Sequence, residues 1–321
     1  MEVNRPVLPA SAKSVQPASK LRMRLNHKLA EVRRNRTLYA MIAPYFLIFF
    51  TFTVLPVVLS LIISFTNFNM LELPKWVGWQ NYARLFVQDD VFLIALKNTL
   101  MFAVITGPVS YIACFVLAWI INELSPKVRT FATLVFYAPA LSGNAFIVWT
   151  LLFSGDAYGY INAFLMKWRI ILEPILWLKD TKYIMPIIII VQLWLSLGTS
   201  FLAFIAGLQG MDKSLYEAGA IDGVKNRWQE LWYITLPSMR PQLLFGAVIQ
   251  ITSSFAVAEV ATTLAGFPSV QYAGHTIVTH LMDFGSLRYE MGYASSIGTV
   301  LFGIMLGSNL IVQKLLRKVG D

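Results

Sequence analysis

Long runs of apolar residues, separated by shorter polar segments, occupy most of this chain. Six runs stand out, at residues 38–65, 92–121, 131–153, 184–208, 243–264 and 293–316. Each is long enough for an α-helix that crosses the hydrocarbon of a bilayer, which takes about 20 residues. Several runs contain Pro, Gly, Ser or Thr, which packed membrane helices tolerate. The pattern predicts an all-α fold, a polytopic membrane helix bundle of about six transmembrane helices.

Composition supports a chain that is solvated largely by lipid. Of its 321 residues, 57% are hydrophobic and only 13% are charged, whereas a soluble domain carries roughly 25% charged residues. The single cysteine, Cys114, lies inside an apolar run and has no intrachain disulfide partner. The three histidines, His27, His275 and His280, are scattered along the chain. We therefore expect no catalytic residue and no metal site.

Basic residues are concentrated at the beginning of the chain. Nine of its 26 Lys and Arg residues precede residue 37, and the net charge is +9. Residues 1–36 are interpreted as a cytoplasmic basic tail. Within it, residues 20–36 form either an amphipathic helix on the inner leaflet or a charged flank that only sets orientation. Residues 37–321 form the membrane domain, and no basic groove with interleaved aromatic residues indicates nucleic-acid binding.

The distribution of Lys and Arg also predicts the orientation in the membrane. If the N-terminus is cytoplasmic, the inner segments hold 18 basic residues and the outer loops hold seven. Because basic residues favour the cytoplasmic side, both termini are predicted to lie inside. The outer loop at residues 154–183 opposes this rule with four basic residues. It also carries Tyr158, Tyr160, Trp168 and Trp177, which are candidate anchors at the membrane interface.

The cytoplasmic loop at residues 209–241, between the fourth and fifth spans, contains signals for short helices. Ser214 and Glu217 match the S-x-x-E capping box that begins a helix, and Gly223 is a typical residue at a helix end. One apolar face is predicted between them at a spacing of three, formed by Leu215, Ala218 and Ile221.

A second helix is predicted over residues 227–234, ending at Leu236 and Pro237 where the fifth span begins. A helix of two turns is not stable alone in water. The first helix therefore needs a docking surface, which is either the chain's own membrane helices or another protein.

The same loop resembles the EAA loop of permease subunits of binding-protein-dependent ABC importers, in the carbohydrate-uptake family of maltose and glycerol-phosphate type. That loop has the pattern E-A-A-x-x-x-G, followed by I-x-L-P. The corresponding residues here are Glu217, Ala218, Gly219, Ile221, Asp222, Gly223, Ile234, Leu236 and Pro237. Gly219 departs from the pattern, because it stands at the second alanine. Further resemblances over residues 38–318 include the segments S-F-T-N-F at 64–68, V-G-W-Q-N-Y at 77–82, K-N-T-L at 97–100, G-L-Q at 207–209 and D-F-G at 283–285.

The resemblance implies an assembly and a mechanism. Two permeases, expected as a heterodimer, pair around the translocation path, and each inserts its EAA helix, the coupling helix, into a cleft on a cytoplasmic ATP-binding-cassette ATPase dimer. An extracytoplasmic solute-binding protein delivers a sugar or oligosaccharide. ATP and Mg²⁺ bind the separate ATPase. This chain has no G-x-x-x-x-G-K-[ST] phosphate-binding loop, so we expect it to bind no cofactor and to be no enzyme. The expected location is the plasma membrane of a bacterium.

Polar residues inside the predicted spans are candidates for the substrate path, because such residues are costly to place in a membrane. They are Gln192, Ser196, Thr199, Gln250, Ser253 and Glu259. The first three are expected on one helical face. Hydrogen bonding between helices is the alternative role for each candidate. Two other functions stay open: an importer of a different solute, such as glycerol phosphate, a peptide or a polyamine, and a secondary transporter.

Overall fold

The computed structural model describes residues 34–317, most of which are helical. The predicted basic tail falls largely on residues 1–33, outside the described residues. The chain divides into two compact units, one ending at Leu59 and the other beginning at Ser60. All candidate site residues belong to the second unit.

The first described segment is helical from residue 36 onward. It comprises α2 (Arg36–Phe49), the π-helical turn η1 (Phe50–Val54) and α3 (Leu55–Ile63), which continues into the second unit. The wide turn η1 lies just before Pro56, which has no N–H to donate and whose ring would clash with the carbonyl four residues earlier. Large apolar side chains are exposed all around α2, which is typical of a membrane-spanning helix.

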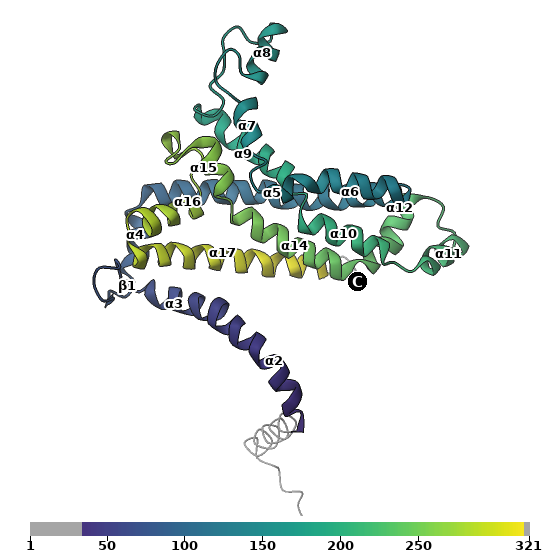
Figure 1. Cartoon of the computed structure of the whole chain (residues 1–321), viewed down its shortest axis with the longest axis horizontal. Helices are drawn as coiled ribbons and strands as arrows, with labels where there is room; N and C mark the ends of the chain where they lie inside the picture. The colour runs from purple at the N-terminus through teal and green to yellow at the C-terminus, as the bar shows by residue number, and fades with distance from the viewer. Residues whose placement is uncertain (1–33, 318–321) are drawn as a thin grey trace, which may run out of the picture. The chain divides into compact units, whose positions relative to one another are not determined.

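Four helices form the bundle of the second unit (Figure 1). They are α5 (Asp90–Asn122), α10 (Thr199–Gln209), α14 (Arg240–Phe255) and α17 (Met291–Arg317). Helix α5 packs against α10 and α14, and α14 also packs against α17. The ring of Phe204 in α10 lies directly over Gly246 in α14, where a β-carbon would collide with it. Such small residues let membrane helices approach closely.

Shorter elements connect the four bundle helices. Before α5 lie β1 (Thr66–Asn67), β2 (Lys75–Trp76) and α4 (Gln80–Val87). Between α5 and α10 lie α6 (Pro126–Leu141), α7 (Ile147–Leu152), α8 (Tyr160–Lys167) and α9 (Thr181–Leu195). Between α10 and α14 lie α11 (Lys213–Ile221), α12 (Arg227–Glu230), the π-helical turn η2 (Leu231–Thr235) and α13 (Leu236–Ser238). Between α14 and α17 lie α15 (Glu259–Ala265), the 3₁₀ turn η3 (Val270–Tyr272), α16 (Ile277–Met282) and the π-helical turn η4 (Asp283–Leu287).

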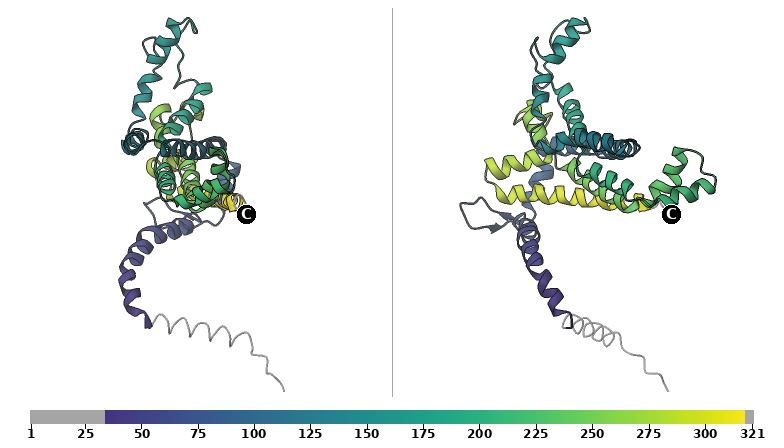
Figure 2. Two further views of the ribbon diagram at one scale, coloured as in Figure 1. Left: turned by 90° about the vertical axis from the view of Figure 1, so that its right-hand side faces the viewer. Right: turned by 45° about the vertical axis from the view of Figure 1, so that its right-hand side comes forward.

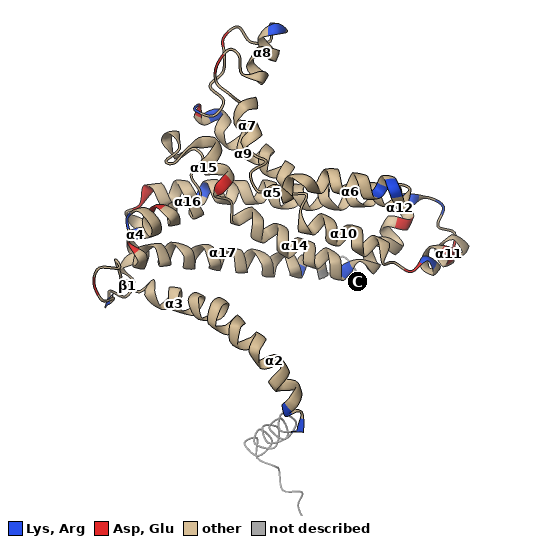
Figure 3. Cartoon of the chain, viewed as in Figure 1, with Lys and Arg blue, Asp and Glu red and all other residues tan. Residues whose placement is uncertain are grey.

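The two ends of the bundle carry different elements. Helices α11 and α12 lie at one end, and α4 and α16 lie at the other (Figure 1). Charged residues gather at these ends and around α8, whereas α17 carries none along its length between the ends (Figure 3). This distribution is typical of helices that cross the apolar layer of a membrane.

The end with α4 and α16 is held together by hydrogen bonds to the backbone. Strands β1 and β2 form a two-residue antiparallel pair. Asn81 Nδ2 in α4 donates to the carbonyls of Ser64 and Thr66 at 2.8 and 2.9 Å. The Gly292 N–H donates to the Phe68 carbonyl at 2.9 Å, so this turn rests directly on the start of α17.

Three of the predicted spans are interrupted. The sequence predicts one helix over residues 131–153, but α6 ends at Leu141 and α7 begins at Ile147, because Gly143 adopts a φ of +62° that a helix excludes. The spans at 184–208 and 243–264 are broken between α9 and α10 and between α14 and α15. Within residues 34–317, five helical runs are long and apolar enough to cross a membrane: Arg36–Ile63, Asp90–Asn122, Thr181–Gln209, Arg240–Ala265 and Met291–Leu316.

Candidate functional site

Helix α11 occupies the centre of the loop that the sequence analysis singled out. Its N-cap is Asp212, whose carboxylate accepts a hydrogen bond from the Ser214 N–H at 2.9 Å. The predicted capping box of Ser214 and Glu217 is therefore wrong, because both residues lie inside the helix. Asp212 is an equally good N-cap and begins the helix two residues earlier. The hydrogen bond from Ser214 lowers the pKa of the Asp212 carboxyl.

Gly223 ends α11, as predicted. Its φ of +94° is a conformation that residues with a β-carbon rarely adopt. The Val224 N–H donates to the Gly219 carbonyl at 2.9 Å, and the Gly223 N–H donates to the Ala220 carbonyl at 3.4 Å. This pair of bonds is a Schellman motif, which satisfies carbonyls at a helix end. The short helix is thereby fixed at both ends.

One face of α11 packs on the chain itself. Gly219 is buried, and a β-carbon there would lie 2.5 Å from Ile234 Cδ1 of η2. Tyr216 Oη lies 3.1 Å from Thr235 Oγ1 in the same turn. Gly219 and Ile234, which belong to separate parts of the loop pattern, are therefore in contact.

The other face of α11 has no cover within residues 34–317. The predicted apolar face is exposed, and its members are Leu215, Ala218 and Ile221. Ile221 is 87% exposed, and Glu217 and Asp222 are exposed as well. The described part of the chain therefore supplies a docking surface for one face of α11 and leaves the other face uncovered.

The second helix of the loop is longer than predicted. α12, η2 and α13 form a helical run from Arg227 to Ser238. Pro237 does not end this run, contrary to the prediction. The wide turn η2 directly precedes Leu236 and Pro237, as η1 precedes Pro56, and gives the proline ring room. The run ends at Met239, and α14 begins at Arg240.

Arg227 connects this loop to the end of α5. Its guanidinium lies 2.8 Å from the Glu123 carboxylate and 2.6 Å from that of Glu230. The hydrogen bond to Glu230, and then the charge of Glu123, raise the pKa of Arg227. The Trp228 ring lies against Trp119 of α5, with centroids 5.4 Å apart. A polar cavity of about 460 Å³ adjoins these contacts, so the loop is joined to α5 around a space that leaves room for movement.

Two of the predicted substrate-path residues meet inside the bundle. Gln250 Nε2 donates to the Ser196 carbonyl at 3.3 Å and lies 3.3 Å from Cys114 Sγ. The Ser196 hydroxyl donates to the Leu193 carbonyl at 2.6 Å. Both carbonyls lie at the break between α9 and α10, where helical hydrogen bonds are missing. Gln250 and Ser196 therefore stabilise irregular backbone at membrane depth.

The same break corrects one prediction. Gln192 and Thr199 do not share a helical face, because α9 ends at Leu195 and α10 begins at Thr199. The cause is Gly198, whose φ of −109° and ψ of −131° are not helical. A helical periodicity drawn through residues 192, 196 and 199 cannot detect such a change of direction.

The remaining candidates lie nearer the surface of the second unit. Thr199, Ser253 and Glu259 are exposed, and Gln192 is half-buried. Glu259 begins α15, directly after the non-helical residues 256–258. An exposed carboxylate within a membrane domain faces water or a protein partner rather than lipid. These four residues are accessible to a solute or to a second subunit.

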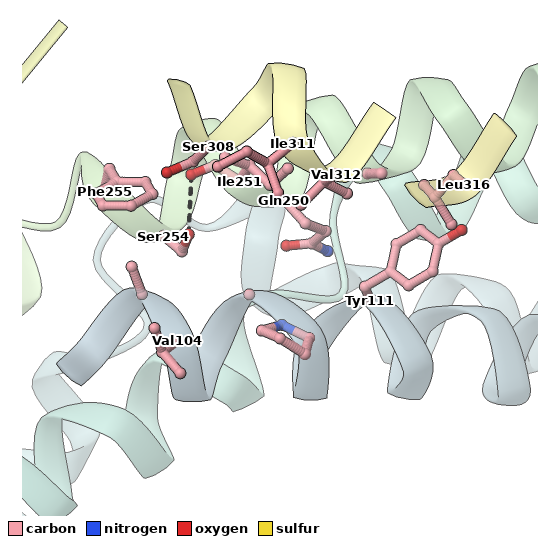
Figure 4. A pocket seen from close by; sticks show the side chains of 14 residues that line it. Val104, Tyr111, Gln250, Ile251, Ser254, Phe255, Ser308, Ile311, Val312 and Leu316 are labelled. Carbon is pink, nitrogen blue, oxygen red and sulfur yellow. Dashed lines mark hydrogen bonds between the residues drawn. The ribbon is translucent and has the colours of Figure 1, made fainter. Parts of the chain in front are cut away.

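An apolar pocket of about 370 Å³ lies between α5, α14 and α17 (Figure 4). Its walls include Val104, Pro108, Ile251, Ile311 and Val312. Its polar groups are largely engaged, since Gln250 donates to Ser196 and the Ser254 hydroxyl donates to the Ile251 carbonyl at 2.8 Å. Specific binding of a polar solute needs several convergent polar groups. This pocket suits an apolar side chain or a lipid tail better than a sugar.

Two residues of the motif at 97–100 form hydrogen bonds to the backbone of the segment that precedes α16. Asn98 Nδ2 donates to the carbonyls of Tyr272 and His275, both at 3.0 Å. Thr99 Oγ1 accepts a hydrogen bond from the Ile277 N–H at 2.9 Å. These side chains hold the segment before α16 against α5, just as Asn81 holds the turn after α3.

One buried polar cluster was not recognised in the sequence. His280 Nε2 lies 3.0 Å from Asp89 Oδ2, and His275 Nε2 lies 3.2 Å from His280 Nδ1. Tyr293 Oη donates to Asp89 Oδ2 at 2.7 Å. Burial lowers the pKa of both imidazoles, that of His275 to about 4. The cluster joins the start of α5 to α16 and α17, and no local motif shows it because its members are far apart in sequence.

No set of His, Cys, Asp and Glu side chains within residues 34–317 is arranged to hold a metal ion. The polar cluster around His280 is therefore best described as a buried hydrogen-bonded network, whose partners satisfy one another.

No family model matches the chain, but individual proteins do. The probable ABC transporter permease YesP of Bacillus subtilis (strain 168) is 31% identical over 280 residues, which cover 86% of this chain and 89% of YesP. The arabinooligosaccharide transport permease AraP of the same organism is 32% identical over 279 residues, covering 86% and 87%. The lactose transport permease LacF of Rhizobium radiobacter is 34% identical over 212 residues, covering 64% and 68%.

Solved structures share the fold. A bacterial ABC transporter involved in the import of the acidic polysaccharide alginate matches with a TM-score of 0.73 and 25% identity, over 92% of this chain and 100% of that chain. The alginate transporter in complex with its alginate pentasaccharide-bound periplasmic protein gives a TM-score of 0.74 at 24% identity. Together with the helix bundle, these similarities assign the chain: it belongs to the permease family of carbohydrate-type ABC importers.

Proposed function

We propose that this chain is the permease subunit of an ATP-driven importer that moves a sugar or oligosaccharide across the plasma membrane of a bacterium. Its relatives AraP and LacF, named for arabinooligosaccharides and lactose, support this substrate class. A binding protein outside the membrane delivers the solute, as suggested by the periplasmic protein in the alginate transporter complex. A second permease and an ATPase dimer complete the assembly, and ATP and Mg²⁺ bind the ATPase.

In this proposal both termini and the loop with α11 are cytoplasmic. The turn between α5 and α6, the loop with α11 and the end of α17 lie at one end of the second unit (Figure 1). These are the segments predicted to lie inside, so a single orientation satisfies them all. The sixth crossing is made by the interrupted pair α6 and α7.

The observation that carries the proposal is the division of α11 into a covered and an open face. Gly219 and Tyr216 attach the helix to η2, and caps at Asp212 and Gly223 keep it rigid. The open face, with Ile221, inserts into a cleft on the ATPase. Movement of the ATPase then moves α11 as a rigid body and, through Arg227 and Glu123, moves α5.

The solute path is proposed to follow the three helix breaks. Phe146 at the α6–α7 break, Val257 at the α14–α15 break and Val191 in α9 belong to one buried cluster. A β-carbon on Gly198, at the α9–α10 break, would lie 3.7 Å from Ala140. Irregular backbone at membrane depth occurs where it is buried in protein or lines a water-filled path. The exposed candidates Thr199, Ser253 and Glu259, with Gln192, then contact the solute, whereas Gln250 and Ser196 hold the backbone that positions them.

Co-purification of the ATPase tests the coupling role. Wild-type chain extracted in detergent is expected to bring down an ATPase and a second permease. A Glu217→Lys, Gly223→Pro double variant should lose the ATPase and keep the second permease. Lys225→Gln, an exposed change in the same loop but outside α11, is the matched control. The proposal fails if the wild-type chain purifies alone or if the double variant retains the ATPase.

Transport kinetics test the path. Thr199→Val and Glu259→Gln should raise the KM for the transported sugar and leave the thermal unfolding midpoint unchanged, because both side chains are exposed. Gln250→Leu should instead lower the unfolding midpoint, since it removes the hydrogen bond from Gln250 to the Ser196 carbonyl, and a buried hydrogen bond is worth about 1 kcal/mol. An unchanged KM in both exposed variants would contradict the path.

A further inference from the structure

The loop between α7 and α9 is a tightly folded element at the edge of the second unit. Helix α8 lies away from α5, α10, α14 and α17 in all three views (Figures 1 and 2). Buried Asn162 holds the loop together. Its Nδ2 lies 3.2, 3.1 and 3.0 Å from the carbonyl oxygens of Ser154, Asp156 and Ile175. Its Oδ1 accepts hydrogen bonds from the Ile175 N–H at 3.2 Å and from Trp177 Nε1 at 2.8 Å.

The exposed side of α8 is aromatic. Tyr160, Phe164 and Trp168 follow one another at a spacing of four residues and therefore share a face. They are 70%, 59% and 67% exposed, and Ile170 and Leu172 just beyond the helix are exposed as well. The rings of Phe164 and Trp168 lie 6.2 Å apart. An ordinary surface helix presents its polar face outward, whereas this helix is held by a buried amide and presents its aromatic face.

The charges next to the aromatic face are basic. Residues 157–172 contain Lys167 and Arg169 and no acidic residue, and Asp156 and Glu173 lie directly outside this range. Both basic residues flank Trp168, at the end of the aromatic face. Trp and Tyr favour the boundary between lipid headgroups and acyl chains, and nearby Lys and Arg bind lipid phosphate groups.

We propose that the aromatic face of α8, formed by Tyr160, Phe164 and Trp168 with Ile170 and Leu172, lies in the interfacial layer of the phospholipid bilayer. The aromatic rings enter the layer beneath the headgroups, and Lys167 and Arg169 contact phosphate. The proposal accounts for two of the four basic residues of this loop that oppose the positive-inside rule, because Lys167 and Arg169 bind the lipid surface. Asn162 satisfies backbone carbonyls and an N–H that would otherwise lie unpaired near hydrocarbon.

Both leaflets of a bilayer have an interfacial layer, so the proposal does not depend on the orientation of the chain or on its substrate. A binding protein and a second permease are the competing occupants of the face. Each would exclude both lipid and water from it, which gives the experiment distinct outcomes.

Nitroxide accessibility in the assembled transporter tests the proposal. Single cysteines replace Phe164, Leu172 and, as a water-exposed reference, Lys225, and the complex is placed in nanodiscs of phosphatidylethanolamine and phosphatidylglycerol. Cys114 is fully buried, so unmodified chain gives the labelling background. Labels at positions 164 and 172 should show an oxygen-to-nickel-chelate collision ratio several-fold higher than the label at 225.

Two results would overturn the proposal. A ratio at positions 164 and 172 equal to that at 225 would place the face in water. Low collision rates with both reagents would place it under a protein. If Phe164→Cys fails to assemble, the labels at Leu172 and at Ile170, introduced as Ile170→Cys, decide between the same outcomes.

Discussion

The Cδ1 atom of Ile234 lies 2.5 Å from the point that a β-carbon on Gly219 would occupy. The two residues stand at separate parts of the EAA-type pattern, and in this chain they are packing partners. The pattern has an alanine at position 219. Here the space of that methyl group is filled by Ile234, so the departure from the pattern is compensated within the loop.

This contact predicts how the two positions interact. Gly219→Ala alone forces Ile234 to move and should weaken ATPase co-purification. Gly219→Ala with Ile234→Val should restore it, because valine lacks the δ-carbon that collides. Ile234 is half-buried, and an Ile→Val change in a protein core costs about 0.5–1.5 kcal/mol of stability. A double-mutant cycle on ATPase retention measures the interaction, and strictly additive effects would show that the two side chains do not couple.

The pair of Arg227 and Glu123 predicts a modest, salt-dependent interaction. Their side chains are 61% and 42% exposed, and solvent screening limits such pairs to about 0–1 kcal/mol. Arg227→Glu should therefore lower the unfolding midpoint slightly and impair transport more, because it detaches the loop from α5. The swapped pair Arg227→Glu with Glu123→Arg should recover part of the transport. Recovery that persists in high salt would argue against a simple ion pair.

The buried histidines predict a loss of stability in acid. Burial, and then the charge of His280, lower the pKa of His275 from 6.5 to about 4. Between these values the unfolded chain binds a proton that the folded chain excludes, so stability falls as the pH falls through this window. One residue contributes about 1.4 kcal/mol for each pH unit.

The measurement is the unfolding midpoint of wild type and His275→Phe across that window. Phe267 stacks on the His275 ring, and phenylalanine keeps an aromatic ring at this position while removing the titratable group. The variant should show a flatter pH dependence whatever its absolute stability. The titratable and charged groups that face the site are His280, Asp89, Asp283 and Arg288, and the variant leaves all four in place. A pH dependence identical to that of wild type would exclude His275 as the cause.

Two glycines of α17 predict opposite responses to the same substitution. A β-carbon on Gly292 would collide with the carbonyl oxygen of Thr66, which is backbone and cannot swing away. A β-carbon on Gly303 would have no neighbour within 4 Å. Gly292→Ala should destabilise the chain by about 1–3 kcal/mol, whereas Gly303→Ala should be neutral or stabilise by up to about 1 kcal/mol. Thermal unfolding of both variants decides, and equal midpoints would contradict the close approach of the turn to α17.

The long helices could be predicted from the sequence because their apolar runs are longer than those of helices in the core of a soluble domain. The breaks could not be placed. Gly143 and Gly198 look like the small residues that membrane helices tolerate, and only their backbone angles in the fold identify them as breaks. The same limit explains the helical face wrongly predicted for residues 192, 196 and 199.

The site was predictable where it depends on local pattern. Gly223 ends α11 as expected, because a positive φ is a local requirement. The cap was misassigned because Asp212 and Ser214 are both good caps two residues apart. The contacts of Gln250 with Ser196, and of His280 with Asp89, join distant segments, so polarity alone singled out Gln250 without showing which partner it binds.

Helix α5 differs from α10 and α14, which pack against it, because its 33 residues continue without a break, even past Pro108. It begins beside the buried histidines and ends beside Glu123, the partner of Arg227. Its length is about 50 Å at the α-helical rise per residue. If α5 tilts as a rigid body by about 5° about its end near Arg227, its other end moves by about 4 Å. In the proposed mechanism the interrupted spans beside it would bend at their breaks, while α5 would transmit the displacement from one end of the bundle to the other.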